Sequence, residues 1–556
     1  MINEKIPSIR NVNTILSTCL LSITPHLNRQ AMDQVSYPSI FNDVIGPVMR
    51  GPSSSHCAAS LRIGRLCRDL MDGKISEVLI EFDPNGSLAT THKSQGSDMG
   101  LFGGFLGWEA HDERLPHAEG AINTAGIKIA IDIVDIQADH PNTYKITLSN
   151  SKETRAMTAI STGGGMIEVI AIDGAKVSMQ GDYHETLVYC QSAEEVVRYL
   201  KGSIGFDHVL VHEGNPNIVE VKSQRPASGE TLEELRALKA VQFIKQLSPV
   251  LPVLSRKGLE VPFITCAEML EYNKGKGLAL WELAVRYECM RGNISAEEVF
   301  EKMRAIVRIM QSSIDQGLAG TKYEDRILGS QSPNFKRKHE EGRLVDGNVL
   351  NHIVMYVSAM MEVKSSMGVI VAAPTAGSCG ALPGAVLGAA NTMGLPEEET
   401  VKAMLAAGLI GVFIAAHSTF AAEVGGCQAE CGSGSSMAAA AIVHLAKGSL
   451  QQSIAAASVA LQNSLGMVCD PIANRVEAPC LGKNVMAASN ALSCANMALA
   501  DYDPLIPLDE VIEAMYQVGN SIPSTLRCTN LGGLSITQTA KALEAKLERQ
   551  QFFKSC

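Results

Sequence analysis

The longest strongly apolar stretch of this chain is AMLAAGLIGVFIAA, residues 403–416. Alanine and glycine alternate in it with large aliphatic residues, a composition that favours close packing of helices through small residues. The stretch is about 14 residues long, whereas a helix that crosses a bilayer needs about 20. It therefore predicts a buried core helix.

The sequence on both sides of this stretch is also helical in pattern. From about Ile264 onward strand signals disappear, and apolar residues recur at helical spacing. Breaks rich in Gly and Pro interrupt the pattern at 373–384, 423–435 and 469–484. We expect a large, mostly all-α catalytic domain over residues 264–556.

The N-terminal half has mixed signals that predict an α+β domain over residues 39–165. Residues 78–83 and 144–148 alternate like strands, and the apolar run 127–136 is compatible with a strand or a helix. Residues 1–38 have little pattern and are expected to be an N-terminal extension.

A small α+β module is expected over residues 166–228. Its signals are a hairpin around Asp173-Gly174, strands at 185–189, 208–212 and 218–221, and a helix at 192–200. Residues 229–263 are expected to form a linker and an amphipathic helix over 231–246. The fold class is therefore multidomain, with the N-terminal α+β domain, the small module and the all-α domain in that order.

Composition limits the classes of partner and compartment. The net charge is −11 and no long basic run is present, which argues against nucleic acid and anionic membranes as partners. The 14 cysteines include no CxxC pair, so structural zinc and a disulfide scaffold are not expected. We expect a reducing, cytoplasmic location; the N-terminus lacks a signal-peptide pattern, and a transit peptide stays open.

Four cysteines carry the most chemical information. Cys427, Cys469 and Cys480 lie at Gly- or Pro-marked breaks of the helical region, and Cys556 ends the chain. Three thiolates can hold three irons of a [4Fe–4S] cluster and leave the fourth iron open to substrate, with a terminal thiolate to cover it. This pattern points to a hydro-lyase. Free cysteine is also a common buried small hydrophobe, and Cys431 is a competing candidate ligand.

The segment Gly51-Pro52-Ser53-Ser54-Ser55-His56 combines a rigid turn, three hydroxyls and an imidazole. The hydroxyls could hold a carboxylate, and His56 could move a proton. The alternative is a serine-capped start of the helix that residues 57–70 predict.

Two further segments have small residues suited to an anion. They are STGGG, residues 161–165, and APTAGSCG, residues 373–380. Glycines let backbone N–H groups approach an anion, and the second segment opens a helix. Ordinary turns are the alternative at both places.

Taken together, these motifs resemble the iron–sulfur-dependent L-serine dehydratase (L-serine ammonia-lyase) family in its single-chain form, with fused β and α regions. GPSSSH and STGGG match the β region, while APTAGSCG, EVGGCQAE at 423–430 and the CDP…PC pair at 469–480 with Asn484 match the α region. The matches occur in the family's order. Departures are Cys57 after the SSSH, Cys431, the long N-terminal extension, and an ACT-like middle module without a Gly-rich ligand loop.

The resemblance implies conversion of L-serine to pyruvate and ammonia with a [4Fe–4S] cluster as cofactor. It implies that Cys427, Cys469 and Cys480 are cluster ligands and that Cys556 is a fourth. His56 is the candidate acid or base. The candidate substrate contacts are Ser53, Ser54, Ser55, Thr162, Gly163, Gly164, Thr375, Ala376, Gly377 and Asn484. The pocket is expected between the α+β and helical domains, and the assembly is expected to be a homodimer.

Two other functions stay open. One is a pyridoxal-phosphate dehydratase that uses a glycine loop for phosphate. The other is an amino-acid sensor attached to an inactive helical domain. The sequence also leaves open serine against threonine or a related β-hydroxy acid.

Overall fold

The structure of the chain is a computed structural model that describes residues 37–201 and 205–555. The expected N-terminal extension lies almost wholly outside the described residues, and so does Cys556. Residues 38–556 form one compact unit.

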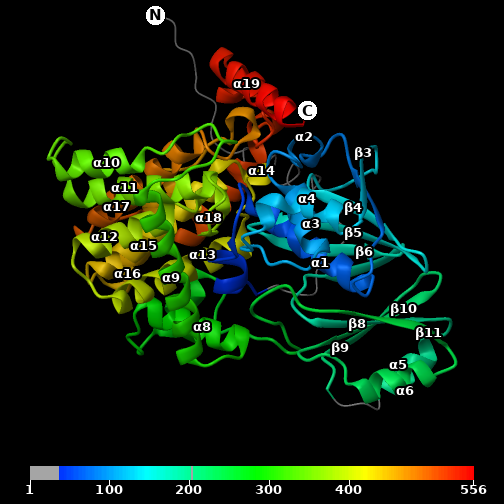
Figure 1. The fold of residues 1–556 in the computed structure, drawn as a ribbon. Helices are drawn as coiled ribbons and strands as arrows, with labels where there is room; N and C mark the ends of the chain where they lie inside the picture. Colours follow the sequence, from blue (N-terminus) through cyan, green and yellow to red (C-terminus); the bar gives the residue numbers. More distant parts are fainter. Residues whose placement is uncertain (1–36, 202–204, 556) are drawn as a thin grey trace, which may run out of the picture. The chain divides into compact units, whose positions relative to one another are not determined.

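A six-stranded sheet forms the centre of the N-terminal region (Figure 1). The order is β3-β2-β4-β5-β6-β7, with β2 and β3 parallel and the other neighbours antiparallel. The apolar run 127–136, which was compatible with a strand or a helix, contains the edge strand β3. The strands are β2 (Glu77–Phe82), β3 (Lys128–Ile133), β4 (Thr143–Ser149), β5 (Thr154–Gly163), β6 (Met166–Ile172) and β7 (Ala175–Met179). The helix α1 (Ala59–Leu70) packs against β5 and β6, and α3 (Ser97–Phe105) packs against α1.

The predicted hairpin at Asp173-Gly174 is confirmed, but it belongs to this sheet. Both residues have positive φ, +48° and +84°, as a two-residue type I′ turn requires. Because β6 pairs with β5, the sheet continues past residue 166, which was the expected start of the module. Hydrogen bonding between neighbouring strands, which the local pattern does not reveal, decides this boundary.

The small module is a four-stranded antiparallel sheet of order β11-β8-β10-β9. Along the chain it has the order βαββαβ. Its elements are β8 (His184–Cys190), α5 (Ala193–Lys201), β9 (His208–His212), β10 (Asn217–Ser223), α6 (Gly229–Ala237) and β11 (Val241–Leu247).

The prediction of a helix over residues 231–246 is wrong for the second half of that segment. The helix α6 ends at Ala237, and β11 follows within the segment expected to be a linker and helix. The Phe243 ring stacks on Tyr189 of β8, with 4.2 Å between the ring centroids. Pairing with the sheet therefore overrides the local helical pattern.

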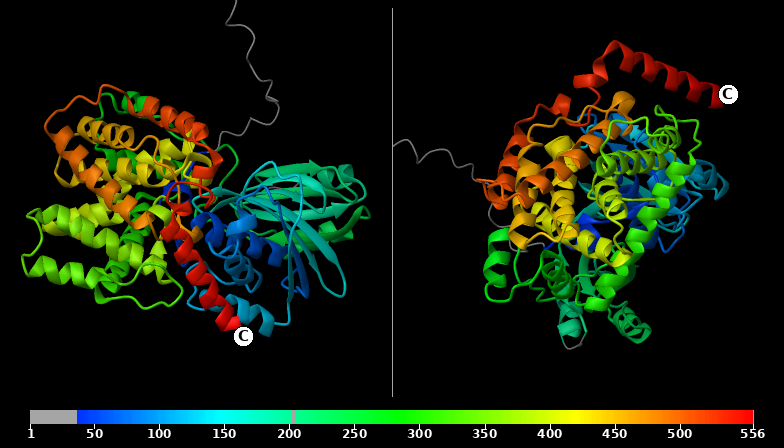
Figure 2. Two further views of the ribbon diagram at one scale, coloured as in Figure 1. Left: turned by 90° about the horizontal axis from the view of Figure 1, so that it is seen from above. Right: turned by 90° about the vertical axis from the view of Figure 1, so that its left-hand side faces the viewer.

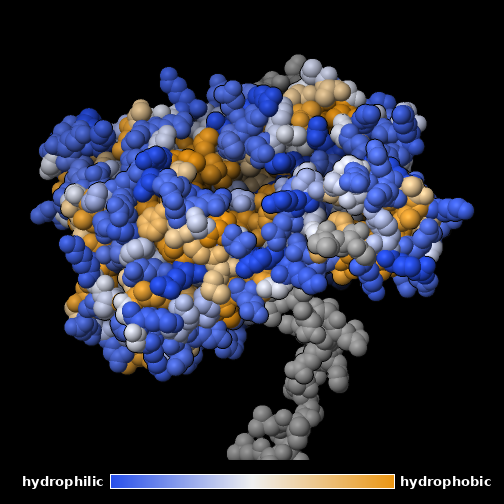
Figure 3. All heavy atoms as spheres, turned by 90° about the horizontal axis from the view of Figure 1, so that it is seen from below, coloured by the Kyte–Doolittle hydropathy of each residue, from blue (hydrophilic) through white to orange (hydrophobic). Residues whose placement is uncertain are grey.

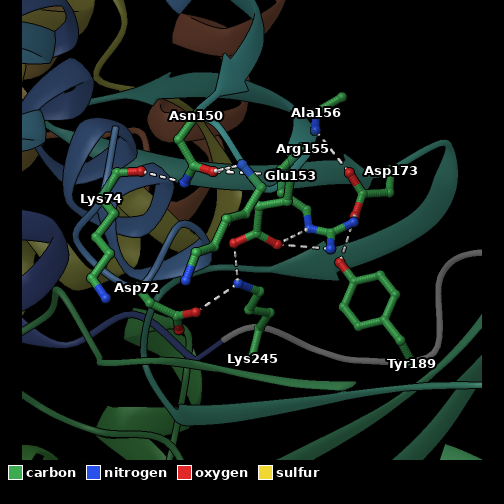
Figure 4. A network of polar contacts seen from close by, with 10 residues as sticks. Asp72, Lys74, Asn150, Glu153, Arg155, Ala156, Asp173, Tyr189 and Lys245 are labelled. Atoms are coloured by element: carbon green, nitrogen blue, oxygen red, sulfur yellow. Dashed lines mark hydrogen bonds and ion pairs between the residues drawn. The ribbon is translucent and has the colours of Figure 1, made fainter. Parts of the chain in front are cut away.

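A network of charged side chains joins the two sheets (Figure 4). Lys245 of β11 donates from Nζ to Asp72 Oδ2 and Glu153 Oε1, each at 2.7 Å. Arg155 of β5 bonds Glu153 at 2.8 Å and lies over the Phe243 ring, 4.2 Å from its centroid. Because Lys245 is only 4% exposed, these bonds are needed to hold its charge at the junction.

The C-terminal region is helical, as predicted (Figures 1 and 2). Within its described part, the strand β12 (Ile370–Val371) pairs with β1 (Val48–Met49) of the N-terminal region. The main helices are α7 (Cys266–Asn273), α8 (Leu280–Gly292), α9 (Ala296–Ala319), α10 (Ser332–Glu340), α11 (Asn348–Ser365), α12 (Ala381–Thr392), α13 (Glu397–His417), α15 (Ser433–Leu445), α16 (Leu450–Gln462), α17 (Cys480–Leu499), α18 (Leu508–Ser521) and α19 (Gln538–Ser555).

The apolar stretch predicted to be a core helix is part of α13. Residues 403–414 are all buried, and α13 contacts α8, α9, α15 and α18. Its length and composition would suffice for a membrane span, but 78% of its most apolar window is buried by the rest of the protein.

Two glycines of α13 let an N-terminal segment approach closely. A Cβ on Gly408 would lie 2.7 Å from Ile40 Cγ2, and one on Gly411 would lie 2.1 Å from Val44 Cγ1. Both contacts are to the π-helical turn η1 (Ile40–Val44). Burying each of these side chains contributes about 1.5–3 kcal/mol, so the small residues of α13 attach the N-terminal region to the helical one.

One hydrophobic core continues from the six-stranded sheet into the helical region. A second, smaller core lies within the four-stranded sheet and its two helices. On the face shown in Figure 3, hydrophilic residues cover most of the surface, and hydrophobic residues gather near its middle.

Candidate active site

His56 lies in a π-helical turn, η2 (Ser54–Ala58), that leads into α1. The side chain of Ser53 makes no capping hydrogen bond; its Oγ lies 3.0 Å from His56 Nδ1 instead. His56 is fully buried. The interpretation of this segment as a simple serine cap is therefore wrong, and the π-helical turn is a feature often found at functional sites.

The hydrogen bonds of Thr91 assign the tautomer of His56. Thr91 Oγ1 lies 2.9 Å from His56 Nε2 and donates its own hydrogen to Ser87 O at 2.6 Å. A hydroxyl has one hydrogen, so it must accept from Nε2–H. Nδ1 is then the unprotonated nitrogen, and it accepts from the Ser53 hydroxyl.

Burial keeps His56 uncharged and raises the pKa of its acidic neighbour. Desolvation, with a smaller effect of His92, lowers the pKa of His56 to about 3. Glu423 Oε1 lies 3.7 Å from His56 Nδ1, and burial raises the pKa of this carboxyl. Although the two groups are close enough for an ion pair, neutral imidazole cannot form one. Glu423 Oε2 is buried and has no hydrogen-bond partner among the described residues.

The segment Thr375–Gly377 meets the β region, as expected for a site between the two. Ala376 N donates to Ser54 Oγ at 3.1 Å. The Thr375 hydroxyl donates to Glu430 Oε1 at 2.6 Å, and a Cβ on Gly377 would lie 2.6 Å from the same oxygen. The chain's own carboxylate therefore occupies the place where an anion was expected. Burial raises the pKa of Glu430 to about 7.

Asn484 supports this segment from α17. Its Oδ1 accepts from Ala381 N at 2.9 Å and Gly380 N at 3.2 Å. Its Nδ2 donates to Gly377 O at 2.8 Å and to Cys480 O at 2.9 Å. Both the oxygen and the nitrogen of its amide are thus hydrogen-bonded to backbone groups of the chain. The structure therefore gives Asn484 a positioning role.

The glycine-rich segment is the turn between β5 and β6. Thr162 is exposed, whereas Gly163 and Gly164 are buried. A Cβ on Gly163 would lie 2.9 Å from Ala421 Cβ, and one on Gly164 would lie 3.5 Å from Pro374 O. The turn therefore docks on the helical region beside Glu423 and Thr375. Ser55 is also buried, within η2.

Five buried thiols gather next to these residues. Cys427, Cys431, Cys469 and Cys528 share one small cluster. Cys427 Sγ lies 3.6 Å from Cys431 Sγ, and Cys528 N donates to Cys469 O at 2.9 Å. Cys480 lies beside this cluster, because Asn484 Nδ2 contacts both Cys480 O at 2.9 Å and Cys431 Sγ at 3.6 Å. The three predicted internal ligands are thus brought together, while Cys556 lies outside the described residues.

These residues fit the implied cluster. No group of three or more His, Cys, Asp or Glu among the described residues is close enough to hold a single ion. A four-iron cluster binds each thiolate to a different iron, so its ligands need not converge on one point. Burial raises the pKa of Cys480, and a hydrogen bond with Cys528 together with burial raises that of Cys469. A metal must therefore displace their protons.

A cavity of about 530 Å³ lies between the two regions. Pro52, His92 and Asp98 line it from the β region, and Asp325 and Arg475 line it from the helical region. Its size suits a small-molecule ligand. Pro52 directly precedes Ser53, and Arg475 lies between Cys469 and Cys480 in the chain.

The chain is similar to several known proteins. Residues 275–535 match the family described as serine dehydratase alpha chain. The L-serine dehydratase alpha chain of Peptoniphilus asaccharolyticus is 35% identical over 280 residues, which cover 50% of this chain and 96% of that one. The chain belongs to the L-serine dehydratase family. This family consists of L-serine ammonia-lyases, so the chain is an enzyme of that class.

Other relatives show that the family's two regions are fused here. The probable L-serine dehydratase beta chain of Bacillus subtilis (strain 168) is 40% identical over 154 residues, 28% of this chain and 69% of that one. L-serine dehydratase 1 of Escherichia coli (strain K12) is 32% identical over 286 residues, 50% of this chain and 62% of that one. One chain therefore carries both an alpha-type and a beta-type region.

Several site residues had no signal in the sequence. Two of them, Thr91 and Cys528, lie outside the motifs. The other two, Glu423 and Glu430, lie within a motif but had no role assigned to them. Glu423 and Glu430 flank Cys427 in the EVGGCQAE segment, and this proximity is the one local indication available. Thr91 and Cys528 are brought to the site by tertiary structure alone.

Proposed function

We propose that the protein is a [4Fe–4S]-dependent L-serine dehydratase that produces pyruvate and ammonia. Family membership supports the activity on L-serine. The burial of Cys427 and Cys469 in one small cluster, with Cys480 beside it, is the observation that carries the cofactor. Cys556 is proposed as the ligand that covers the fourth iron in the absence of substrate.

The Ser53–His56 pair is proposed to remove the Cα proton. The neutral imidazole has its free nitrogen, Nδ1, at the Ser53 hydroxyl, and Thr91 holds the opposite N–H. Positioned acid–base groups of this kind contribute about 10²–10⁴-fold to rate. When bound, the cluster would supply a Lewis-acidic iron that makes the serine hydroxyl a better leaving group. Loss of a proton and hydroxide leaves aminoacrylate, which tautomerises and hydrolyses to pyruvate and ammonia.

Glu423, Glu430 and Asn484 are proposed to shape the closed site. Asn484 holds the Gly377–Ala381 backbone, and Glu430 fixes Thr375. The βαββαβ module is proposed to be ACT-like, and the described residues assign it no effector.

Iron analysis of anaerobically purified variants tests the cofactor. The parent should contain about four irons per chain, and Cys427→Ala, Cys469→Ala and Cys480→Ala should each lose iron, visible absorbance and serine turnover. Cys431→Ala and Cys528→Ala are the matched controls, because each removes a buried thiol of the same cluster; both should keep most of the iron. Turnover by an iron-free protein with bound pyridoxal phosphate would refute the proposal.

A further inference from the structure

Lys364 is a buried cation without a hydrogen-bond partner. It is the penultimate residue of α11 and is 1% exposed. Its Nζ has no hydrogen-bond partner among the described residues. An ammonium has three donors, and leaving them unsatisfied away from water is costly.

Glu362 on the same helix is equally buried, so burial alone does not explain why the Lys364 ammonium lacks hydrogen-bond partners. Glu362 is also 1% exposed, but its Oε1 accepts from Gln331 N at 2.9 Å and Ser332 N at 3.0 Å. The fold thus satisfies one buried charge of α11 completely and leaves the other with open donors.

Lys364 lies at the candidate active site. Met361, three residues before it on α11, contacts the segment that follows Gly377: its Sδ lies 3.8 Å from Cys379 Sγ, and a Cβ on Gly380 would lie 2.9 Å from its Cγ. The helix α17, which begins at Cys480, and the helix α12, which begins two residues after Cys379, both pack against α11.

Several other candidate anion-binding groups are already hydrogen-bonded within the protein. Ser53 Oγ bonds His56, Ser54 Oγ accepts from Ala376 N, and Thr375 Oγ1 donates to Glu430. The second lysine near the thiols, Lys483, donates to Val468 O and Asp470 Oδ1, each at 2.6 Å. Lys364 differs from these groups because its ammonium has no hydrogen-bond partner among the described residues.

We propose that Lys364 binds the carboxylate of the amino-acid substrate. The inference rests on the proposed function, which requires an α-amino acid in this site. A carboxylate would satisfy the open ammonium donors, and the charge would favour loss of the Cα proton beside it. Hydrogen bonds of this charged kind correspond to about a 10- to 100-fold change in affinity when lost.

Lys364→Met and Lys364→Gln test the proposal in the cluster-loaded protein. Iron content should be unchanged, and kcat/KM for L-serine should fall about 10- to 100-fold. Lys402→Met is the matched control, because Lys402 lies on α13 and pairs with Glu398 and Glu399. It should behave like the parent.

Two probes separate recognition of the carboxylate from a general disturbance. Calorimetry should show that 3-hydroxypropionate, which keeps the carboxylate, binds the Lys364 variants about 10- to 100-fold more weakly than the parent. Ethanolamine, which lacks a carboxylate, should bind all proteins equally. Equal weakening of both probes, no weakening of 3-hydroxypropionate, or loss of iron from both variants would overturn the proposal.

The parent protein distinguishes failure of the inference from failure of the function. A parent without iron and without serine turnover would refute the proposed function and, with it, the role of Lys364. A parent that is active while the Lys364 variants match it would refute the inference alone.

Discussion

At the scale of single residues, the chemistry depends on which nitrogen of His56 is free. The Thr91 hydroxyl donates to Ser87 O and so must accept from Nε2–H, which leaves Nδ1 as the basic atom beside Ser53. Glu423 lies near the same nitrogen at 3.7 Å. Removing the imidazole should thus remove the base without touching a cluster ligand.

His56→Ala should bind iron normally and lose about 10²–10⁴-fold in serine turnover. Because burial lowers the pKa of His56 to about 3, its neutral form persists across pH 5–8, and its protonation should cause no loss of turnover in that range. Iron content, kcat and the pH profile are the measurements. His352→Ala, which changes a half-buried histidine of α11, is the control. Near-normal turnover of His56→Ala would contradict the assignment.

At the scale of elements, the last helix lies next to the proposed cluster. The helix α19 packs against η6 (Ile472–Asn474), which lies between Cys469 and Cys480. The segment before α19 is tied to the same loop, since Leu534 N donates to Asp470 Oδ2 at 2.8 Å and Ser535 Oγ donates to Pro471 O at 3.0 Å. A small cavity of about 200 Å³ separates α19 from the turn around Thr90. Figure 2 shows α19 as the red helix that ends the chain.

Cys556→Ala should leave the cluster assembled but speed its inactivation by oxygen. A tethered thiolate competes at high effective concentration for the open iron, so its loss should expose that iron. Cys556 itself lies outside the residues that the structure describes. The measurement is the half-life of activity and absorbance in air without serine. Cys494→Ala, which removes a buried thiol of α17, is the control; equal half-lives for Cys556→Ala and the parent would contradict a covering role.

At the scale of the whole molecule, a partly buried carboxyl group marks the junction of the regions. Asp43 lies in η1, which packs on α13, and its neighbours include Arg62 of α1 and Arg291 of α8. Burial, opposed by the hydrogen bond from Ser39 N and by the two arginines, raises the pKa of Asp43 to about 6. The folded protein thus holds this proton more tightly than the unfolded chain does.

Asp43→Asn should make thermal stability less dependent on pH. A raised carboxyl pKa stabilises the fold fully below the ordinary value of 3.8, and this contribution is lost as pH rises through about 6. The stability of the parent relative to Asp43→Asn should therefore fall between pH 5 and 7.5, by about 1–2 kcal/mol after allowance for partial exposure. Melting temperatures of both proteins across this range measure the effect. Asp132→Asn on the exposed edge strand should show no such trend, and a constant Asp43→Asn difference would contradict the assignment.

The sequence by itself determined the features that depend on local periodicity and on residue chemistry. Residues 403–416 are apolar on all sides, so a core helix is the structure that buries them. The I′ turn at Asp173-Gly174 follows from two residues that tolerate positive φ. The cysteines 427, 469 and 480 stood out because they lie at Gly- or Pro-marked breaks of the helical region, and their role as ligands stays a prediction.

Only the tertiary structure decided what depends on contacts between distant segments. The strand β11 replaced part of an expected helix because β8 offered hydrogen bonds and an aromatic partner to a locally ambiguous segment. Glu430 occupies the expected anion site, and Asn484 is committed to backbone groups, because residues from three separate helices converge there. Thr91, Cys528 and Lys364 have ordinary local sequences. Their roles follow from how deeply each side chain is buried and from whether it has a hydrogen-bond partner. Both depend on contacts with distant segments, so no local sequence pattern predicts them.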